Sequence, residues 1–160
     1  YAELFPDSIS KLIIVDVFNK EYDTERFSHI FKAISTISSS KFNSRKDANN
    51  LILEIIKSEG ERNFILKNLK REGDNFSWQP NVNLLNKSIY EISSKINLKS
   101  KIDINTLFIK GQNSNYITDV DINELPNSFS DFNVVEVPNS GHWIHAENPS
   151  GFISTIKNFI

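Results

Sequence analysis

Near the carboxyl end of the chain, a glycine and a histidine follow an apolar segment. Residues 134–137 read Val-Val-Glu-Val, and Gly141-His142-Trp143 comes shortly afterwards. A histidine on the loop after a buried strand is held by the backbone and is free to take a proton from a reacting group. Open α/β sheets build their active sites at this end of their strands. His142 is therefore a candidate general base, although a surface histidine, or one packed against Trp143, would give the same pattern.

The second candidate is Asp16, which follows the apolar run Leu-Ile-Ile-Val at residues 12–15. A carboxylate there is costly to bury unless it has a partner. If the run is a strand of a parallel sheet, its end faces the same crevice as the loop with His142. Asp16 could then accept the imidazole N–H and stabilise the imidazolium. An aspartate at a strand end is also a common helix cap or turn residue, and the residues by themselves leave both roles open.

The other two histidines have weaker settings. His145 lies close to His142, but two histidines without a further clustered ligand are weak evidence for zinc, so we interpret His145 as a supporting residue. His29 lies in a helical pattern beside Ile30 and Phe31, and we interpret it as a surface or interface residue of that helix. We expect no cofactor and no metal.

A nucleophile with a recognisable setting is missing from the chain. The sequence has no Gly-x-Ser-x-Gly elbow, the strained turn that exposes a serine at the end of a strand. It has no cysteine and therefore no thiol nucleophile, thiolate metal site or disulfide. It also lacks a glycine-rich phosphate loop, which argues against a nucleotide enzyme.

The pattern of apolar residues predicts the elements that must position these candidates. Residues 12–15, 106–111 and 134–137 have the composition of strands in a parallel sheet. The spacing of apolar residues and the capping residues predict helices at about 24–37, 44–57 (capped by Ser44), 61–70, 82–95, 119–125 (capped by Thr118) and 149–160 (after Asn148), with a turn at 73–75 and an extended piece at 76–80. We expect an α/β fold whose core comprises residues 1–20 and 98–160, with an all-helical lid or cap insertion at residues 21–97.

Composition excludes several classes of function. The net charge is −2, and Lys and Arg are scattered among Asp and Glu, which argues against nucleic-acid or anionic-lipid binding. No apolar run is long enough to span a membrane, and the absence of cysteine fits a reducing compartment, so we expect a cytoplasmic protein. The chain contains no Met, and residues 1–7 read like the end of a helix stopped near Pro6. We therefore expect it to be a piece of a longer protein.

The chain resembles the carboxyl-terminal part of an α/β-hydrolase, and within that fold it is similar to the YbfF-type esterases. The resemblance is most specific in two stretches, Leu-Phe-Ile-Lys-Gly-Gln-Asn-Ser-Asn-Tyr at residues 107–116 and Gly-His-Trp-Ile-His-Ala-Glu-Asn-Pro at residues 141–149. It is weaker in residues 5–16, in residues 26–34 and in residues 64–68.

The resemblance implies a Ser-Asp-His triad that acts on a carboxylic ester or an acyl thioester, with the serine and the oxyanion donors before Tyr1. Many α/β-hydrolases place the acid after the strand that corresponds to residues 106–110, but the loop at 111–115 has no carboxylate before Asp119. The YbfF-type esterases that the chain resembles instead place the aspartate one strand earlier, at the position that matches Asp16. The resemblance therefore implies that Asp16 is the triad acid rather than Asp119. The insertion would wall the acyl pocket with Phe and Ile. In place of the family's proline-containing turn, residues 17–20 read Val-Phe-Asn-Lys. The resemblance therefore makes no prediction for the first segment of the lid.

The partners expected on this basis are a small-molecule ester or thioester and the missing amino-terminal segment of the same protein. Two alternatives remain at this point. Another enzyme of the same fold, such as a dehalogenase, an epoxide hydrolase or a carbon–carbon hydrolase, would share these elements; an aspartate at the nucleophile elbow would mark the first two. A non-catalytic pseudo-hydrolase or interaction module would carry a broken elbow.

Overall fold

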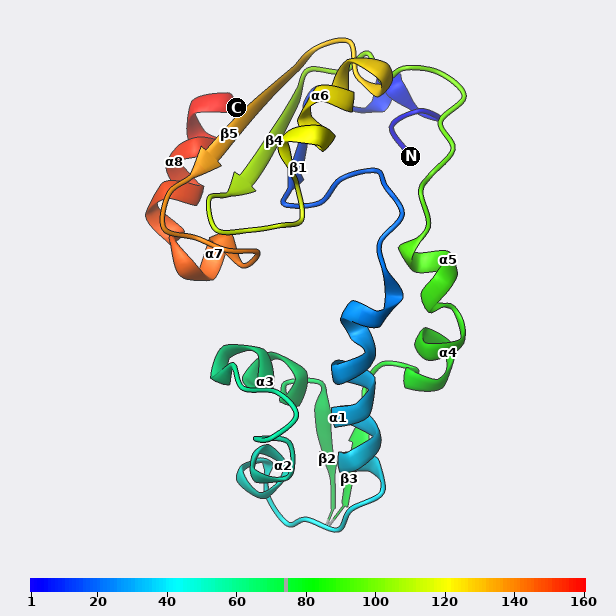
Figure 1. The fold of residues 1–160 in the computed structure, drawn as a ribbon, viewed down its shortest axis with the longest axis vertical. Coiled ribbons are helices and arrows are strands. Elements are labelled where there is room, and N and C mark those ends of the chain that lie inside the picture. The colour runs from blue at the N-terminus through cyan, green and yellow to red at the C-terminus, as the bar shows by residue number, and fades with distance from the viewer. Residues whose placement is uncertain (74) are drawn as a thin grey trace. The chain divides into compact units, whose positions relative to one another are not determined.

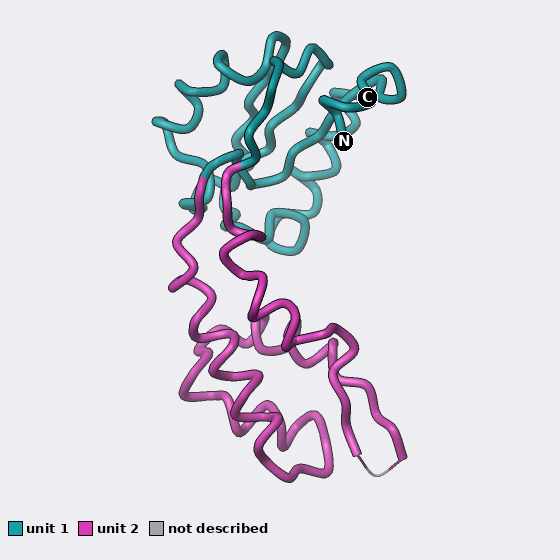
Figure 2. The backbone as a smooth tube through the Cα atoms, turned by 90° about the vertical axis from the view of Figure 1, so that its right-hand side faces the viewer, with its two compact units in different colours: residues 1–20, 96–160 teal, residues 21–95 magenta. Residues whose placement is uncertain are grey.

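The computed structural model describes residues 1–73 and 75–160, so the turn predicted at residues 73–75 includes one residue, Asp74, that lies outside the described ones. The chain forms two compact units, which Figure 2 distinguishes by colour. The first, here called the sheet unit, comprises Tyr1–Lys20 and Ile96–Ile160. The second, here called the insertion unit, comprises Glu21–Lys95.

The sheet unit is built on three parallel strands, β1 (Leu12–Val15), β4 (Thr106–Gly111) and β5 (Phe132–Val137), in the order β1-β4-β5 (Figure 1). The predicted strands are confirmed, and β5 begins slightly earlier than its apolar core suggests. In the register of the sheet, Val15 lies opposite Ile109 and Gly111 lies opposite Val137. The three strands therefore end at the same edge, and the loops that follow them can meet there.

Two cores cover the two faces of this sheet because side chains alternate along a strand. Phe108 of β4 packs with Leu125 of α6 (Asp119–Ser128) on one face. Leu107 and Ile109 of β4 pack on the other face, against α7 (Ile144–Glu147) and α8 (Pro149–Phe159). A short 3₁₀ helix, η1 (Pro6–Ser8), precedes β1.

Capping side chains begin the helices that the sequence predicts in this unit. Thr118 Oγ1 accepts the backbone N–H of Asp121, and the Asp121 carboxylate accepts the backbone N–H of Thr118 in return, which forms a capping box at α6. Asn148 Oδ1 accepts the backbone N–H of Gly151 at 3.0 Å and begins α8. The predicted cap at Thr118 and the predicted start of the last helix at Pro149 are confirmed.

The insertion unit is mainly helical, but the expectation of an all-helical insertion is wrong. Its strands β2 (Leu69–Glu72) and β3 (Asn75–Trp78) form an antiparallel pair in which Leu69 lies opposite Trp78. The preceding helix ends at Leu66, and the side-chain amide of Asn68 donates to the carbonyl of Phe64 in its last turn at 3.1 Å. The helical elements of this unit are η2 (Thr24–Phe27), α1 (Ser28–Ser38), α2 (Arg45–Leu51), α3 (Glu59–Leu66), α4 (Val82–Lys87) and α5 (Ile89–Ser93).

The predicted helices of the insertion unit are present, and the one expected over residues 24–37 is covered by η2 and α1, but the others are shorter or divided. The helix expected over residues 82–95 is divided at Ser88 into α4 and α5, and the one expected over 44–57 ends as α2 at Leu51. Ser44 caps α2 as predicted, since its hydroxyl accepts the backbone N–H of Asp47 at 3.1 Å. The unit has its own buried core, formed by Ala33, Ile37, Ala48, Ile52, Ile56, Ile65, Leu66 and Leu69.

Candidate active site

Asp16 lies directly after β1, and its side chain is fully buried. Its backbone adopts a left-handed conformation with φ of 47°, which an aspartate tolerates better than most residues. Its own N–H still donates to the carbonyl of Ile109 at 2.8 Å, so the chain leaves the sheet only after this residue. The turn places the carboxylate at the ends of the strands rather than within a face of the sheet.

Three donors surround the Asp16 carboxylate. Oδ1 accepts the backbone N–H of Gly111 at 3.0 Å, and Oδ2 accepts the ring Nδ1–H of His142 at 2.8 Å and the hydroxyl of Ser114. Burial raises the pKa of Asp16, but the hydrogen bonds from His142, Ser114 and Gly111 together outweigh it and lower the pKa below its ordinary value of 3.8. The carboxylate is therefore ionised at neutral pH although it is buried.

The His142 ring is oriented by two contacts. An ionised carboxylate can only accept hydrogen bonds, so the hydrogen bond to Asp16 requires the proton to be on Nδ1. Tyr116 stacks on the imidazole with the ring centroids 3.7 Å apart and the planes inclined by 10°. The side chain is 39% exposed, and within residues 1–73 and 75–160 no hydrogen bond engages Nε2. The lone pair of Nε2 is therefore available to accept a proton.

The loops that follow β4 and β5 interlock around this pair. The N–H of Asn113 donates to the carbonyl of Ser140 at 2.8 Å, and the side-chain oxygen of Gln112 accepts the N–H of Asn139 at 2.9 Å. A Cβ atom added to Gly111 would lie 2.2 Å from the carbonyl oxygen of Gly141, so only glycine fits at this crossing. This close approach holds the loop of His142 against Gly111, whose backbone N–H donates to Asp16.

The structure brings together Asp16 and His142, the two site residues expected from the sequence. Asp119, the competing acid, begins α6 with an exposed side chain, and among the described residues the acid that pairs with His142 is Asp16. Sequence reasoning missed Ser114 and Tyr116. Both lie in the stretch 107–116 that carries the resemblance, which was the available signal, but loop serines are common and nothing local marks this one.

The remaining candidates lie elsewhere. His145 is on α7, with its ring centroid 6.3 Å from that of Phe152, and His29 pairs with Glu61 at 2.9 Å inside the insertion unit. Trp78 and Phe76 line a pocket of about 490 Å³ within that unit. In the part of the chain that the structure describes, no cluster of three or more His, Cys, Asp or Glu side chains could hold a metal ion. No helix of the described residues is long and apolar enough to cross a membrane.

The chain is similar to several esterases over nearly its whole length, although no family model matches it. It is 29% identical to esterase YbfF of Escherichia coli (strain K12) over 98% of this chain and 60% of that protein. It is 28% identical to the sn-1-specific diacylglycerol lipase ABHD11 of Mus musculus, over 97% of this chain and 52% of the relative. A solved structure described as a marine microorganism esterase matches with a TM-score of 0.93 and 32% identity, over 99% of this chain and 64% of that one.

These likenesses show that the chain has the α/β-hydrolase fold and is related to esterases of that fold. The chain spans about half the length of the first curated relatives it matches, 52% and 50%.

Proposed function

We propose that this α/β-hydrolase-fold chain carries the acid and the base of a serine esterase, whose nucleophile lies in a preceding segment of the intact protein. The proposed substrates are carboxylic esters or acyl thioesters. The observation that carries the proposal is the hydrogen bond of 2.8 Å between His142 Nδ1 and the buried Asp16 carboxylate. A buried carboxylate that orients an imidazole with a free outer nitrogen has the geometry of a triad acid and base.

The proposed mechanism uses each of these atoms. Nε2 of His142 takes the proton of the serine hydroxyl as the oxygen attacks the acyl carbonyl, and later gives that proton to the leaving alcohol or thiol. Water then attacks the acyl-enzyme with the same assistance and releases the acid. Asp16 keeps the proton on Nδ1 and stabilises the imidazolium that exists between these transfers.

The segment that would supply the serine and the oxyanion donors is proposed from the relatives. The proteins named as esterase YbfF and diacylglycerol lipase ABHD11 extend well beyond the length that matches this chain. In the part of the chain that the structure describes, β1 forms an edge of the parallel sheet. The backbone groups along such an edge can pair with another strand, which the preceding segment would provide.

The test is the hydrolysis of short p-nitrophenyl esters by the intact protein and its variants. We expect His142→Ala and Asp16→Asn each to lower kcat/KM by about 10⁴-fold, as loss of a triad member does. His145→Ala and Asp119→Asn are the matched controls, because both residues are exposed, and we expect both to keep near-normal activity.

Two outcomes would contradict the proposal. Near-normal turnover by His142→Ala would remove the base assignment. A fully active Asp16→Asn protein together with an inactive Asp119→Asn protein would move the acid to Asp119. A parallel assay with an acyl thioester of the same chain length separates the two substrate classes.

A further inference from the structure

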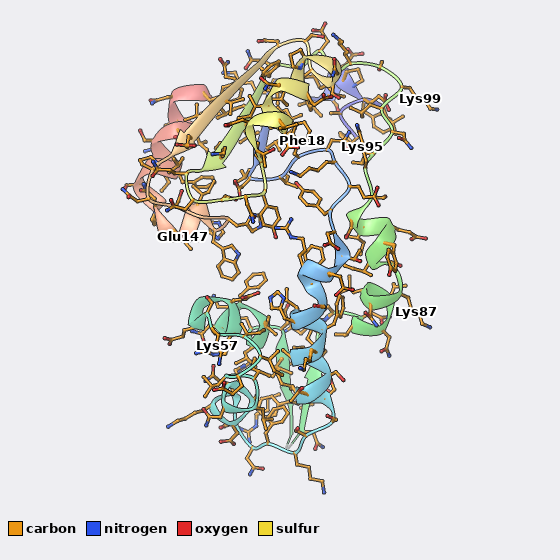
Figure 3. The ribbon with its side chains drawn as sticks, viewed as in Figure 1. Phe18, Lys57, Lys87, Lys95, Lys99 and Glu147 are labelled. Carbon is orange, nitrogen blue, oxygen red and sulfur yellow. The ribbon has the colours of Figure 1, made fainter. Side chains whose placement is uncertain are left out.

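Glu147, the last residue of α7, holds the backbone on both sides of His142. Its Oε2 accepts the N–H of Gly141 at 2.7 Å, and its Oε1 accepts the N–H of Trp143 at 3.3 Å. Figure 3 labels this side chain at α7. One carboxylate thus binds the two peptide groups that flank the histidine, so the backbone angles of His142 are constrained from both ends.

Gly141 is matched to this carboxylate. A Cβ atom at Gly141 would lie 3.3 Å from Oε2 and 3.4 Å from Oε1 of Glu147, which is tighter than an ordinary contact. A larger residue at position 141 would therefore push the carboxylate away from the N–H groups that it binds. The glycine before the histidine therefore permits this close approach of the carboxylate.

The carboxylate is itself anchored to the core of the sheet unit. The N–H of Glu147 donates to the carbonyl of Trp143 at 2.9 Å, which closes the turn of α7. Ile144 on the same turn is fully buried and packs with Leu107 and Val137 of the sheet. Glu147 therefore connects the loop of His142 to an element whose position is determined by core packing.

We propose that Glu147 is a positioning residue for His142, and that its carboxylate holds Nδ1 on Asp16 and Nε2 in the direction of the reacting serine. The catalytic part of this inference rests on the proposed esterase function. A displacement of a catalytic group by about 1 Å can lower a rate about a hundredfold. A loosened loop should act in this way, on the chemical step rather than on substrate binding.

The experiment compares Glu147→Gln with Glu124→Gln in the intact protein. Glutamine keeps the size of the side chain but replaces one acceptor oxygen with an NH₂ group, which cannot accept a backbone N–H. We expect Glu147→Gln to lower kcat by about tenfold to a hundredfold with KM changing little, after correction for the folded fraction. Glu124 is exposed on α6, so Glu124→Gln should leave both constants unchanged.

A second readout does not need activity. The tautomer of His142, measured from long-range ¹H–¹⁵N correlations of the ring, should be the Nδ1–H form in the unsubstituted protein and in Glu124→Gln. We expect a mixture of tautomers in Glu147→Gln, because the ring no longer stays on Asp16. Unchanged kcat, or an unchanged tautomer in Glu147→Gln, would overturn the inference.

A double-mutant cycle tests the match with Gly141. If Gly141→Ala acts by displacing the Glu147 carboxylate, it should lower kcat by a clearly smaller factor in the Glu147→Ala protein than in the unsubstituted protein. Additive effects would contradict the match. If the intact protein hydrolyses neither esters nor thioesters while Glu147→Gln still changes the tautomer, the proposed function fails and the positioning role stands.

Discussion

At the scale of residues, the site depends on keeping one buried carboxylate charged. Three donors, from His142, Ser114 and the backbone of Gly111, converge on Asp16. Together they lower its pKa against the opposing effect of burial. A neutral Asp16 would lose its hold on the imidazolium, so the hydrogen bond from Ser114 supports the acid although Ser114 does not touch the substrate in the proposed mechanism.

Ser114→Ala should raise the pKa of Asp16, because it removes a donor that favours the charged form. In the folded protein the pKa of the Asp16 carboxyl lies below its ordinary value of 3.8. The charged carboxylate therefore stabilises the fold at pH values above 3.8. This stabilisation is lost as the pH falls through the lowered pKa. The loss should therefore begin at a higher pH in Ser114→Ala, as measured by urea unfolding between about pH 2 and pH 6.

The control for this change is Ser130→Ala, which removes an exposed hydroxyl elsewhere in the sheet unit. We expect its unfolding free energy to depend on pH as in the unsubstituted protein. Superimposable curves for Ser114→Ala and Ser130→Ala would show that the serine does not stabilise the charged form of Asp16.

At the scale of elements, the loops after β4 and β5 form one unit. Backbone and side-chain hydrogen bonds join residues 112–113 to residues 137–140, and Gly111 lies under the carbonyl of Gly141. The parallel register brings the ends of the two strands together, and the missing side chain of Gly111 lets the loops touch. The direction of His142 therefore depends on a contact between two different loops.

Gly111→Ala should separate these loops, because its Cβ would lie 2.2 Å from the carbonyl oxygen of Gly141 and backbone atoms must move. We expect the free energy of unfolding to fall by about 1–3 kcal/mol, as for overpacked sites, with a loss of ester hydrolysis in the intact protein. Urea unfolding and the p-nitrophenyl ester assay measure the two effects.

Gly60→Ala is the matched control, because a Cβ at Gly60 in α3 would meet only the Ser58 hydroxyl, at 3.9 Å. We expect it to be neutral or to stabilise the protein by up to about 1 kcal/mol, since alanine favours a helix. Equal stability and activity of the two variants would contradict the role given to the crossing at Gly111.

At the scale of the whole molecule, the chain is divided into two units that each bury a core of their own. In each unit, hydrogen bonding joins the two places at which the chain crosses from one unit to the other. In the sheet unit, the Asn19 side chain donates to the carbonyl of Ile96 at 2.9 Å and accepts its N–H at 2.7 Å. In the insertion unit, the N–H of Tyr22 donates to the carbonyl of Ser93 at 2.8 Å. The role of the insertion unit as a lid stays a prediction.

Residues 21–95 expressed alone should fold, because their core and the pairing of their ends are internal to the unit. We expect a helical circular dichroism spectrum and a single cooperative thermal transition. Ile52→Ala should lower the stability of this fragment by about 2–5 kcal/mol, as for a buried aliphatic side chain. A disordered spectrum for the unsubstituted fragment would contradict its independence.

The sequence by itself determined the features that depend on neighbouring residues. Runs of β-branched residues predicted β1, β4 and β5, polar side chains predicted the caps at Ser44 and Thr118, and the proline after Asn148 predicted the start of α8, because these preferences act within a few residues. For Asp16 the residues alone left two roles open, a triad acid and a strand-end cap, and the resemblance to the YbfF-type esterases favoured the acid.

Only the tertiary structure decided which side chains complete the site. The partners Ser114 and Tyr116 lie in the loop after β4, whereas Asp16 follows β1 and His142 follows β5, so their meeting depends on strand register. The pair of strands β2 and β3 likewise takes the place of a predicted helical end, and Leu69 is buried there in one core with Ile37 and Ile52. Such contacts join residues distant in the chain, and no local pattern encodes their meeting.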